Sequence, residues 1–289
     1  MALRLFIDPE AAALAAGAAL ALPETAARHA QVRRVQPGDR LVLFDGRGHE
    51  AAAEVLALGR REVTVRVGAV AAVERELPWA VTLALGMPTN ERMDALVEKA
   101  TELGAAALQP LLCERSVLRL AGERAERRRA HWQAVAVSAS EQCGRTRVPE
   151  VGTVRGLPDW LAALPGAPGA ARWLLSLDPA ALAPAAALAR SAAPAAGAAA
   201  AISGQGAPGG YGTPGAHATA GKAGTPGMSD AAIIVLSGPE GGLAPAEQEA
   251  ARAAGFVPVG LGSRTLRADT APLALLAWLG LAALGPGQG

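Results

Sequence analysis

The sequence Ile233-Ile-Val-Leu-Ser-Gly-Pro-Glu-Gly-Gly-Leu243 decides the fold of this chain. It begins with four apolar residues, Ile233 to Leu236, which predict a strand buried on both faces. The strand ends in Gly238-Pro-Glu-Gly-Gly242, where glycine permits a sharp turn and leaves backbone amides open to a ligand. Pro245 and Gly255 then mark the first turn and the end of a helix. This order predicts an α/β domain with a ligand site at the carboxyl end of the strand.

A second glycine-containing loop follows the next predicted strand, Phe256 to Leu261. It has the sequence Gly262-Ser-Arg-Thr-Leu-Arg-Ala-Asp-Thr-Ala271 and carries Arg264 and Arg267. Because carboxyl ends of parallel strands meet at one edge of a sheet, we expect both loops to border one site. Simpler interpretations stay open, since the first loop also fits a tight turn without a ligand and the arginines also fit a solvated surface. No Gly-Lys-Ser/Thr signature supports a phosphate loop.

The stretch from Trp79 to Leu112 contains the same alternation of strand and helix. Val81 to Leu85 predicts a strand, and apolar side chains from Met93 to Leu103 fall on one face of a helix. Ala107 to Leu112 predicts the next strand. Such a β-α-β unit is typical of a parallel sheet. Two further elements are predicted, a basic helix at Glu123 to Ser140 and a strand at Arg172 to Leu177.

Residues 1–75 follow a different pattern, in which short apolar runs are separated by turn signals such as Pro37-Gly-Asp39 and Asp45-Gly46. We expect a small β-barrel here. Glu74 to Pro78 is a plausible linker to a second domain of residues 76–289. The expected barrel elements are strands at Leu3 to Ile7, Arg40 to Phe44, Glu50 to Leu58 and Glu62 to Val67, with a helix or turn at Ala26 to Val35.

Residues from Pro179 to Ser229 are dominated by Ala, Gly, Pro, Ser and Thr. The first half predicts an alanine-rich helix. The second half, from about Ser203, cannot bury enough apolar surface to offset its ordering entropy. We expect a flexible surface insertion at about 179–230 and assign it no chemistry.

The composition of the 289-residue chain limits the possible functions. A net charge of +1 means that a nucleic-acid partner must meet a local basic face. The two cysteines match neither a disulfide framework nor a zinc spacing, and His29, His49 and His131 show no ligand pattern, so no metal is expected. The N-terminus is no signal peptide, and the apolar stretch Ala271 to Leu284 is too short to span a bilayer comfortably. We expect a cytoplasmic protein without membrane contact, in which this stretch forms a buried helix.

Five motifs occur in a fixed order, and together they resemble the ribosomal RNA small subunit methyltransferase E family over nearly the whole chain except the insertion. Departures from the family pattern are small: Cys143 replaces a more frequent Ser, Thr265 an Ile and Asp269 a Glu. The motifs are Glu91-Arg-Met-Asp-Ala-Leu-Val-Glu-Lys-Ala-Thr-Glu-Leu-Gly104, Glu114-Arg-Ser116, Glu141-Gln-Cys-Gly-Arg145, Leu236-Ser-Gly-Pro-Glu-Gly-Gly242 and Leu261-Gly-Ser-Arg-Thr-Leu-Arg-Ala-Asp-Thr-Ala271.

The resemblance implies an enzyme that uses S-adenosylmethionine to methylate N3 of one uracil in 16S rRNA, with the assembled small ribosomal subunit as the expected partner. It implies a SPOUT-type α/β domain with a C-terminal trefoil knot, preceded by a PUA-like barrel that grips RNA. No sequence pattern predicts a knot. It also implies a homodimer whose interface lies near the cofactor and includes the helix from Pro272.

The resemblance further implies roles for individual residues. Arg267 would orient the uracil, Glu240 is the first candidate for the proton acceptor and Asp269 the second. Glu240 also fits a simpler role as an acid at a helix N-terminus. The expected RNA-binding arginines are Arg92, Arg115, Arg145, Arg264 and Arg267. The expected cofactor-binding residues are Leu236, Gly238, Pro239, Glu240, Gly241, Gly242, Leu261, Gly262, Leu266 and Ala271.

Two other functions stay open at this point. One is a related knotted methyltransferase that acts on tRNA, against which the motifs Glu114 to Ser116 and Glu141 to Arg145 argue. The other is an RNA-binding ribosome assembly factor that has lost cofactor binding, against which the intact loop Gly238 to Gly242 argues.

Overall fold

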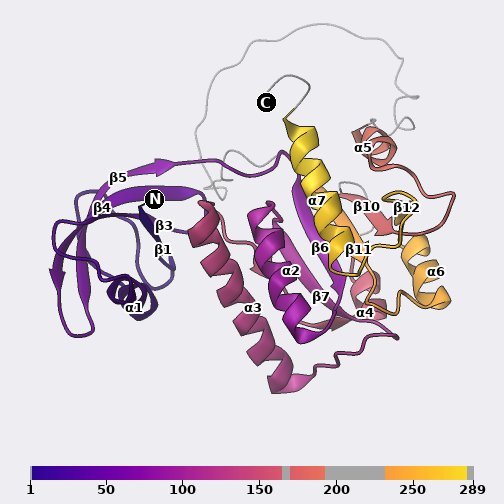
Figure 1. Cartoon of the computed structure of the whole chain (residues 1–289), viewed down its shortest axis with the longest axis horizontal. Helices are drawn as coiled ribbons and strands as arrows, with labels where there is room; N and C mark the ends of the chain where they lie inside the picture. Colours follow the sequence, from indigo (N-terminus) through magenta and orange to yellow (C-terminus); the bar gives the residue numbers. More distant parts are fainter. Residues whose placement is uncertain (1, 165–169, 193–231, 285–289) are drawn as a thin grey trace, which may run out of the picture.

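A computed structural model describes residues 2–164, 170–192 and 232–284 of the chain. Figure 1 shows two regions, an N-terminal sheet and a larger α/β region, joined near residue 75. The helix α5 (Pro184–Ala192) confirms the alanine-rich helix predicted for the first half of the insertion. The surface loop expected for its second half lies outside the described residues.

The N-terminal region is a five-stranded sheet in the order β1-β3-β4-β5-β2, with β1 parallel to β3 and the other pairs antiparallel. Along β5, Val63, Val65 and Val67 are buried while Thr64 and Arg66 face outward, because successive side chains of a strand point to opposite faces. The buried face packs against alanines of α1. The elements are β1 (Leu3–Phe6), β2 (Ala19–Ala21), α1 (Glu24–Val32), β3 (Arg40–Phe44), β4 (His49–Leu58) and β5 (Val63–Ala72).

The larger region is built on a parallel sheet in the order β12-β10-β11-β6-β7-β8, with β9 also paired to β7. The predicted β-α-β unit is confirmed as β6, α2 and β7. The strand predicted at Phe256 to Leu261 is shorter than expected. The elements are β6 (Ala80–Gly86), α2 (Asn90–Glu102), β7 (Ala107–Leu112), α3 (Gly122–Cys143), β8 (Glu150–Val151), β9 (Arg155–Gly156), α4 (Leu157–Ala162), β10 (Ala170–Leu175), β11 (Ala232–Ser237), α6 (Pro245–Ala253), β12 (Val257–Val259) and α7 (Thr270–Ala283).

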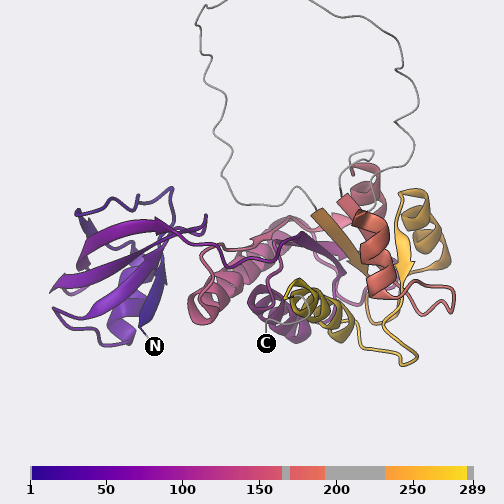
Figure 2. The same cartoon turned by 90° about the horizontal axis from the view of Figure 1, so that it is seen from above.

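Helices cover both faces of this sheet, which explains why its strands are apolar on both sides. On one face, Leu83 and Val235 belong to a core shared with α2, α3, α5 and α7. On the other face, Ala84 and Leu236 pack with α4 and α6. Figures 1 and 2 show α2 and α7 side by side on the first face. The result is a three-layer arrangement, and the α/β domain with a parallel sheet that the sequence predicted is confirmed.

The C-terminal helix α7 is less buried than expected. Leu275, Leu276 and Leu279 are fully buried against the sheet and α2, but Leu281 is 70% exposed. A helix that is apolar on all sides needs a cover on every side. Within the described residues, α7 is covered on one side only, so the prediction of a buried helix is corrected for the single chain.

The two regions meet at the end of α3. The carboxylate of Glu141 accepts a hydrogen bond from the backbone N–H of Phe6 at 3.0 Å and lies 3.1 Å from the Nδ1 atom of His29. Burial raises the pKa of Glu141 above its ordinary value. Gly48 of the N-terminal sheet also donates its N–H to the carbonyl of Thr146, at 3.1 Å. The motif at Glu141 thus ties the N-terminal sheet to the α/β region.

Candidate functional site

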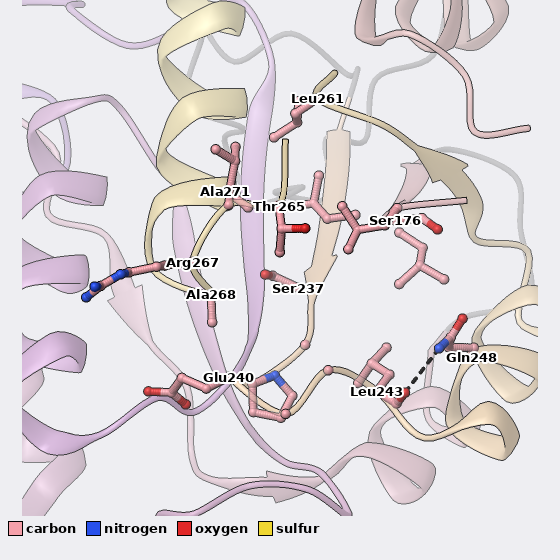
Figure 3. A pocket seen from close by; sticks show the side chains of 18 of the residues that line it. Ser176, Ser237, Glu240, Leu243, Gln248, Leu261, Thr265, Arg267, Ala268 and Ala271 are labelled. Carbon is pink, nitrogen blue, oxygen red and sulfur yellow. Dashed lines mark hydrogen bonds between the residues drawn. The ribbon is translucent and has the colours of Figure 1, made fainter. Parts of the chain in front are cut away.

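A cavity of about 780 Å³ lies at the carboxyl ends of β10, β11 and β12. The two glycine-containing loops predicted to border one site both line it, and Figure 3 shows their side chains around the same space. In a parallel sheet this edge is where ligands bind, because helix N-termini and loop amides gather there. The volume is in the range of cavities that bind small molecules.

The first loop is a tight turn held by its own backbone. Gly242 has a φ of 69°, a left-handed conformation that favours glycine, and its N–H donates to the carbonyl of Pro239 at 2.8 Å. Gly86, at the end of β6, lies directly under the turn. A Cβ atom at position 86 would be 2.5 Å from the Cδ atom of Pro239, so only glycine permits this approach. The backbone of the turn therefore lines the cavity, and its close contact with Gly86 fixes how near it lies to the sheet.

Glu240 leaves this turn toward α2. Its Oε1 atom accepts a hydrogen bond from the N–H of Thr89 at 3.2 Å and lies 3.7 Å from an Nη1 atom of Arg92. In Figure 3 the side chains of Glu240 and Arg267 point to the same side of the cavity, away from Ser176 and Gln248. Glu240 and Arg267 thus lie on one side of the cavity, and Ser176 and Gln248 lie on the other.

The second loop returns the chain from β12 to α7 and lines the cavity with Leu261, Leu266 and Ala271. Arg264 and Arg267 lie on the same loop and are exposed. Among the described residues, neither guanidinium has an ion-pair partner. Two unpaired positive charges at a cavity rim suit an anionic ligand.

Arg115 brings the motif Glu114 to Ser116 to the same rim. Its Nη1 atom donates to the carbonyl of Gly241 at 3.2 Å. A Cβ atom at Gly241 would lie 3.0 Å from the Cβ atom of Arg115, so the two loops are in close contact. Arg92, Arg115, Arg264 and Arg267 therefore surround one cavity, although they come from three separate parts of the sequence.

Three of the predicted site residues, Leu236, Asp269 and Arg145, lie outside the lining of the cavity. Leu236 is completely buried in the core beneath it, because its side chain faces α4 and α6. Asp269 is the N-terminal cap of α7, and its Oδ1 atom is buried without a hydrogen-bond partner among the described residues. Neither Leu236 nor Asp269 therefore lines the cavity in this structure, and Glu240 stays the first candidate for the proton acceptor.

Arg145 lies elsewhere and is only 5% exposed. Its guanidinium donates to the carbonyls of Thr101 and Ala105, at 2.8 and 2.9 Å, and forms an ion pair with Glu76. These acceptors occupy the guanidinium from inside the protein. The expectation that Arg145 binds RNA is therefore corrected, and we assign it to the junction between the two regions.

Several residues on the far side of the cavity were not among the predicted site residues. Gln248 donates to the carbonyl of Leu243 at 3.0 Å, drawn as a dashed line in Figure 3. Arg252 lies one turn further along α6 and pairs with Asp178 at 3.3 Å. The spacing of four residues between Gln248 and Arg252 on a predicted helix was the available signal. It became informative only once α6 was placed beside the cavity.

Three further observations concern a buried thiol, metal ligands and membrane spans in the described residues. Cys113 is buried close by, and burial together with the charge of Glu247 raises the pKa of its thiol to about 12, so it is not a nucleophile. No group of three or more His, Cys, Asp or Glu able to hold a metal ion occurs in the described ranges. None of the helices in those ranges is long and apolar enough to cross a bilayer.

Comparisons with known proteins agree with this geometry. A family profile described as an RNA methyltransferase domain matches residues 75–204 and 215–280, and one described as an RNA methyltransferase PUA domain matches residues 22–68. The ribosomal RNA small subunit methyltransferase E of Mycobacterium bovis is 31% identical over 252 residues, covering 87% of this chain and 82% of the relative. The protein of the same name from Bacillus subtilis is 27% identical over 242 residues, covering 84% and 81%.

A solved structure extends the likeness to three dimensions. The ribosomal RNA small subunit methyltransferase E from Neisseria gonorrhoeae, crystallised bound to S-adenosyl methionine, superposes with a TM-score of 0.75 at 29% identity, over 98% of both chains. The RNA methyltransferase profile alone covers more than half of this chain. The chain therefore belongs to the ribosomal RNA small subunit methyltransferase E family.

Proposed function

We propose that this protein transfers a methyl group from S-adenosylmethionine to N3 of one uridine in 16S rRNA, within the assembled small ribosomal subunit. The observation that carries the proposal is the cavity itself. It combines a glycine-rich backbone turn at the ends of parallel strands with a rim of four arginines, in a chain of this family. A small cofactor fits the turn, and a polyanion fits the rim.

The residues of the cavity suit S-adenosylmethionine, which supplies a methyl group on a positively charged sulfur when bound. The backbone of Gly238 to Gly242 would hold its polar groups, and the backbone of Gly262 would contribute from the second loop. Leu261, Leu266 and Ala271 would contact the adenine, since they form an apolar part of the wall. Gly242 and Gly262 have φ angles of 69° and 99°, a conformation that favours glycine, so both loops depend on glycine for their backbone path.

The arginines of the rim would hold the RNA. Arg264 and Arg267 are exposed, and no described residue pairs with them, so no internal bond has to break before they bind phosphate or a uracil carbonyl. Arg115 is tethered to Gly241 by a single bond and keeps donors free. Arg92 lies beside Glu240 and would contact RNA next to the reacting base. Four such contacts align the uracil with the bound methyl group, and alignment alone can lower the barrier by several kcal/mol.

The N3 proton must leave when the base is methylated. We assign its acceptance to Glu240, the carboxylate that lies on the same side of the cavity as Arg267. Arg267 would stabilise the negative charge that develops on the uracil carbonyl oxygens as the proton leaves. The uracil has to be unpaired or flipped out, because an A-form helix conceals its N3 edge.

Three structural features belong to the same proposal. We infer two domains, residues 1–75 and 76–289, of which the first would grip RNA. We infer the trefoil knot, supported by the path of residues 260–269, which lead from edge strand β12 back to α7, a helix that packs over the inner strand β11. We also infer a homodimer, supported by the exposed apolar side of α7 around Leu281.

The test is transfer of labelled methyl from S-adenosylmethionine to small ribosomal subunits and to free 16S rRNA, both from cells that lack this activity. The product nucleoside is then identified. We expect 3-methyluridine, formed faster on subunits than on free RNA. Subunits from cells that retain the activity are the matched control, because their target base is already methylated and should accept nothing.

Other results would change the assignment. Methylation of tRNA in place of rRNA would favour the related tRNA enzyme. A different methylated nucleoside in 16S rRNA would contradict the assignment to N3 alone. Absence of cofactor binding in calorimetry would favour an assembly factor without catalytic activity.

A further inference from the structure

One buried carboxylate near the cavity has no role in the reaction as described above. Glu247, in the first turn of α6, is only 8% exposed. Its Oε2 atom accepts a hydrogen bond from the N–H of Ala244 at 2.9 Å, and its Oε1 atom accepts one from the N–H of Glu114 at 2.8 Å. Hydrogen bonds to a carboxylate that is shielded from water are among the strong ones in proteins.

The two hydrogen bonds of Glu247 differ in which parts of the chain they connect. The bond to Ala244 is local and is the usual way in which a glutamate at this position satisfies a free amide at a helix N-terminus. The bond to Glu114 joins residues 133 positions apart in the sequence. It connects the helix that follows the glycine turn to the loop that carries Arg115. A helix cap alone would need only the first of these bonds.

Glu247 contacts the loop from Cys113 to Arg119, which carries Arg115 and is held together by hydrogen bonds between its own residues. The hydroxyl of Ser116 accepts the N–H of Cys113 at 3.0 Å, and an Nη2 atom of Arg119 donates to the carbonyl of Glu114 at 2.8 Å. Ser116 and Cys113 are buried, whereas Arg115 is exposed at the rim of the cavity. The loop is therefore a small rigid unit with one arginine projecting from it, and Glu247 fixes that unit to the α/β region.

We propose that Glu247 is a positioning residue, which holds Arg115 where it engages the RNA phosphate or base next to the reacting uracil. The inference rests on the proposed function, since it needs an anionic polynucleotide as the ligand of Arg115. Glu247 itself touches neither the cavity nor the substrate. It acts through the amide of Glu114, so its loss should affect use of the RNA more than binding of the cofactor.

The experiment is a double-mutant cycle between Glu247→Gln and Arg115→Ala. Glutamine has the same shape but keeps only one acceptor oxygen, so one of the two amides loses its partner. We expect Glu247→Gln to lower kcat/KM for the rRNA substrate about 10-fold, through KM more than kcat, with the cofactor Kd changed by less than about 3-fold. The double variant should lose no more than Arg115→Ala alone, because without the Arg115 side chain Glu247 has nothing to position.

Glu249→Gln is the matched control, since it makes the same chemical change two residues along α6, at a side chain that is 77% exposed. It should keep wild-type kinetics. Should Glu247→Gln not fold, Glu247→Asp, which keeps the charge but shortens its reach, goes through the same cycle. In the folded wild type, hydrogen exchange at the amide of Glu114 should also be slow.

Three results would overturn the proposal: multiplying losses in the double variant, an equal loss of cofactor affinity, or fast exchange at Glu114. Failure of the proposed function is recognised separately, because the wild-type protein would then fail to methylate rRNA in the same assay. An active wild type with a fully active Glu247→Gln variant would reject only the positioning role.

Discussion

Two short motifs of this protein each contain a glutamate and an arginine but have opposite uses. Glu114-Arg-Ser116 places Arg115 at the rim of the cavity, where it is exposed and makes one bond to a backbone carbonyl. Glu141-Gln-Cys-Gly-Arg145 places Arg145 inside the protein, where carbonyls and the carboxylate of Glu76 surround its guanidinium. From the sequence alone, both arginines were expected to bind RNA.

The difference lies in what each guanidinium finds inside its own chain. An arginine has five N–H donors in a fixed fork, and those already satisfied internally are not available to a ligand. Arg145 uses its Nε, Nη1 and Nη2 atoms on acceptors from the linker and from around the end of α2. Motifs that both contain a glutamate and an arginine can therefore serve a junction in one place and a binding site in another.

The largest effect, a loss of unfolding free energy, is expected for the variant Arg145→Ala. The change leaves the Glu76 carboxylate without its partner in a half-buried position and removes donors from two buried carbonyls. Breaking a buried pair in this way costs about 3–5 kcal/mol of unfolding free energy. Urea denaturation measures the loss, and methyl transfer per folded molecule, assayed in the cold, should stay near that of the wild type.

Arg147→Ala is the control for Arg145→Ala. Arg147 pairs with the more exposed Glu74 at 3.3 Å, so its loss should cost at most about 1 kcal/mol. An Arg145→Ala protein of normal stability that no longer methylates rRNA would return Arg145 to the RNA-binding set.

The second prediction concerns Arg267, an arginine at the rim of the cavity. Arg267→Ala should lower kcat/KM for rRNA about 100-fold, equivalent to roughly 2.7 kcal/mol, because a donor aimed at developing charge is lost. Cofactor affinity and thermal stability should be nearly unchanged, since Arg267 is exposed and unpaired among the described residues. Methyl-transfer kinetics and calorimetry with the cofactor measure the two quantities.

Arg190→Ala, at an exposed arginine of α5 outside the cavity lining, should leave both quantities unchanged. Equal losses of methyl transfer and cofactor affinity in Arg267→Ala would contradict the RNA role given to this residue.

A third variant, Gly86→Ala, tests the backbone of the glycine turn and leaves the arginines of the cavity unchanged. In Gly86→Ala, the new methyl group would lie 2.6 Å from the backbone nitrogen of Pro239, so the glycine turn must move. We expect a loss of about 1–3 kcal/mol in stability and a cofactor Kd about 10-fold higher. Gly59→Ala is the control, because a Cβ atom there meets its nearest neighbour, in Glu62, at an ordinary 3.5 Å. Unchanged cofactor affinity in Gly86→Ala would mean that the turn does not hold the cofactor.

The smallest effect is expected at the junction in acid. Hydrogen bonding to Arg75, with a further contribution from Arg4, lowers the pKa of Glu50 to about 2, against desolvation. Because the folded-state pKa is lowered, the stabilisation is complete above the ordinary pKa of about 4.5 and disappears as the pH falls toward 2. The amount is about 1 kcal/mol, since Arg75 is largely solvated.

Unfolding free energies of the wild type and of Glu50→Gln, measured from pH 6 to pH 2, check this prediction. The two curves should differ at pH 6 and converge in the acid range. A constant difference across the range would show that Glu50 titrates normally in the folded protein.

The sequence by itself determined the layout of the protein. Alternating valines gave β5, apolar runs gave the buried strands, and glycine with proline marked the turn at Gly238 to Gly242. These features rest on interactions between near neighbours, so local periodicity and turn chemistry reveal them. The residues of both cavity loops could also be predicted from the sequence, because the carboxyl ends of parallel strands share one edge of the sheet.

Only the tertiary structure decided which of these residues can act on a ligand. Arg145 pairs with Glu76, which is 69 positions away in the sequence, and Glu247 accepts a hydrogen bond from Glu114, which is 133 positions away. Asp269 falls behind the cavity wall because α7 begins there. No local pattern encodes partners so far apart, since they meet only when the sheet has ordered its strands. Sequence thus identified the groups capable of the chemistry, and packing selected among them.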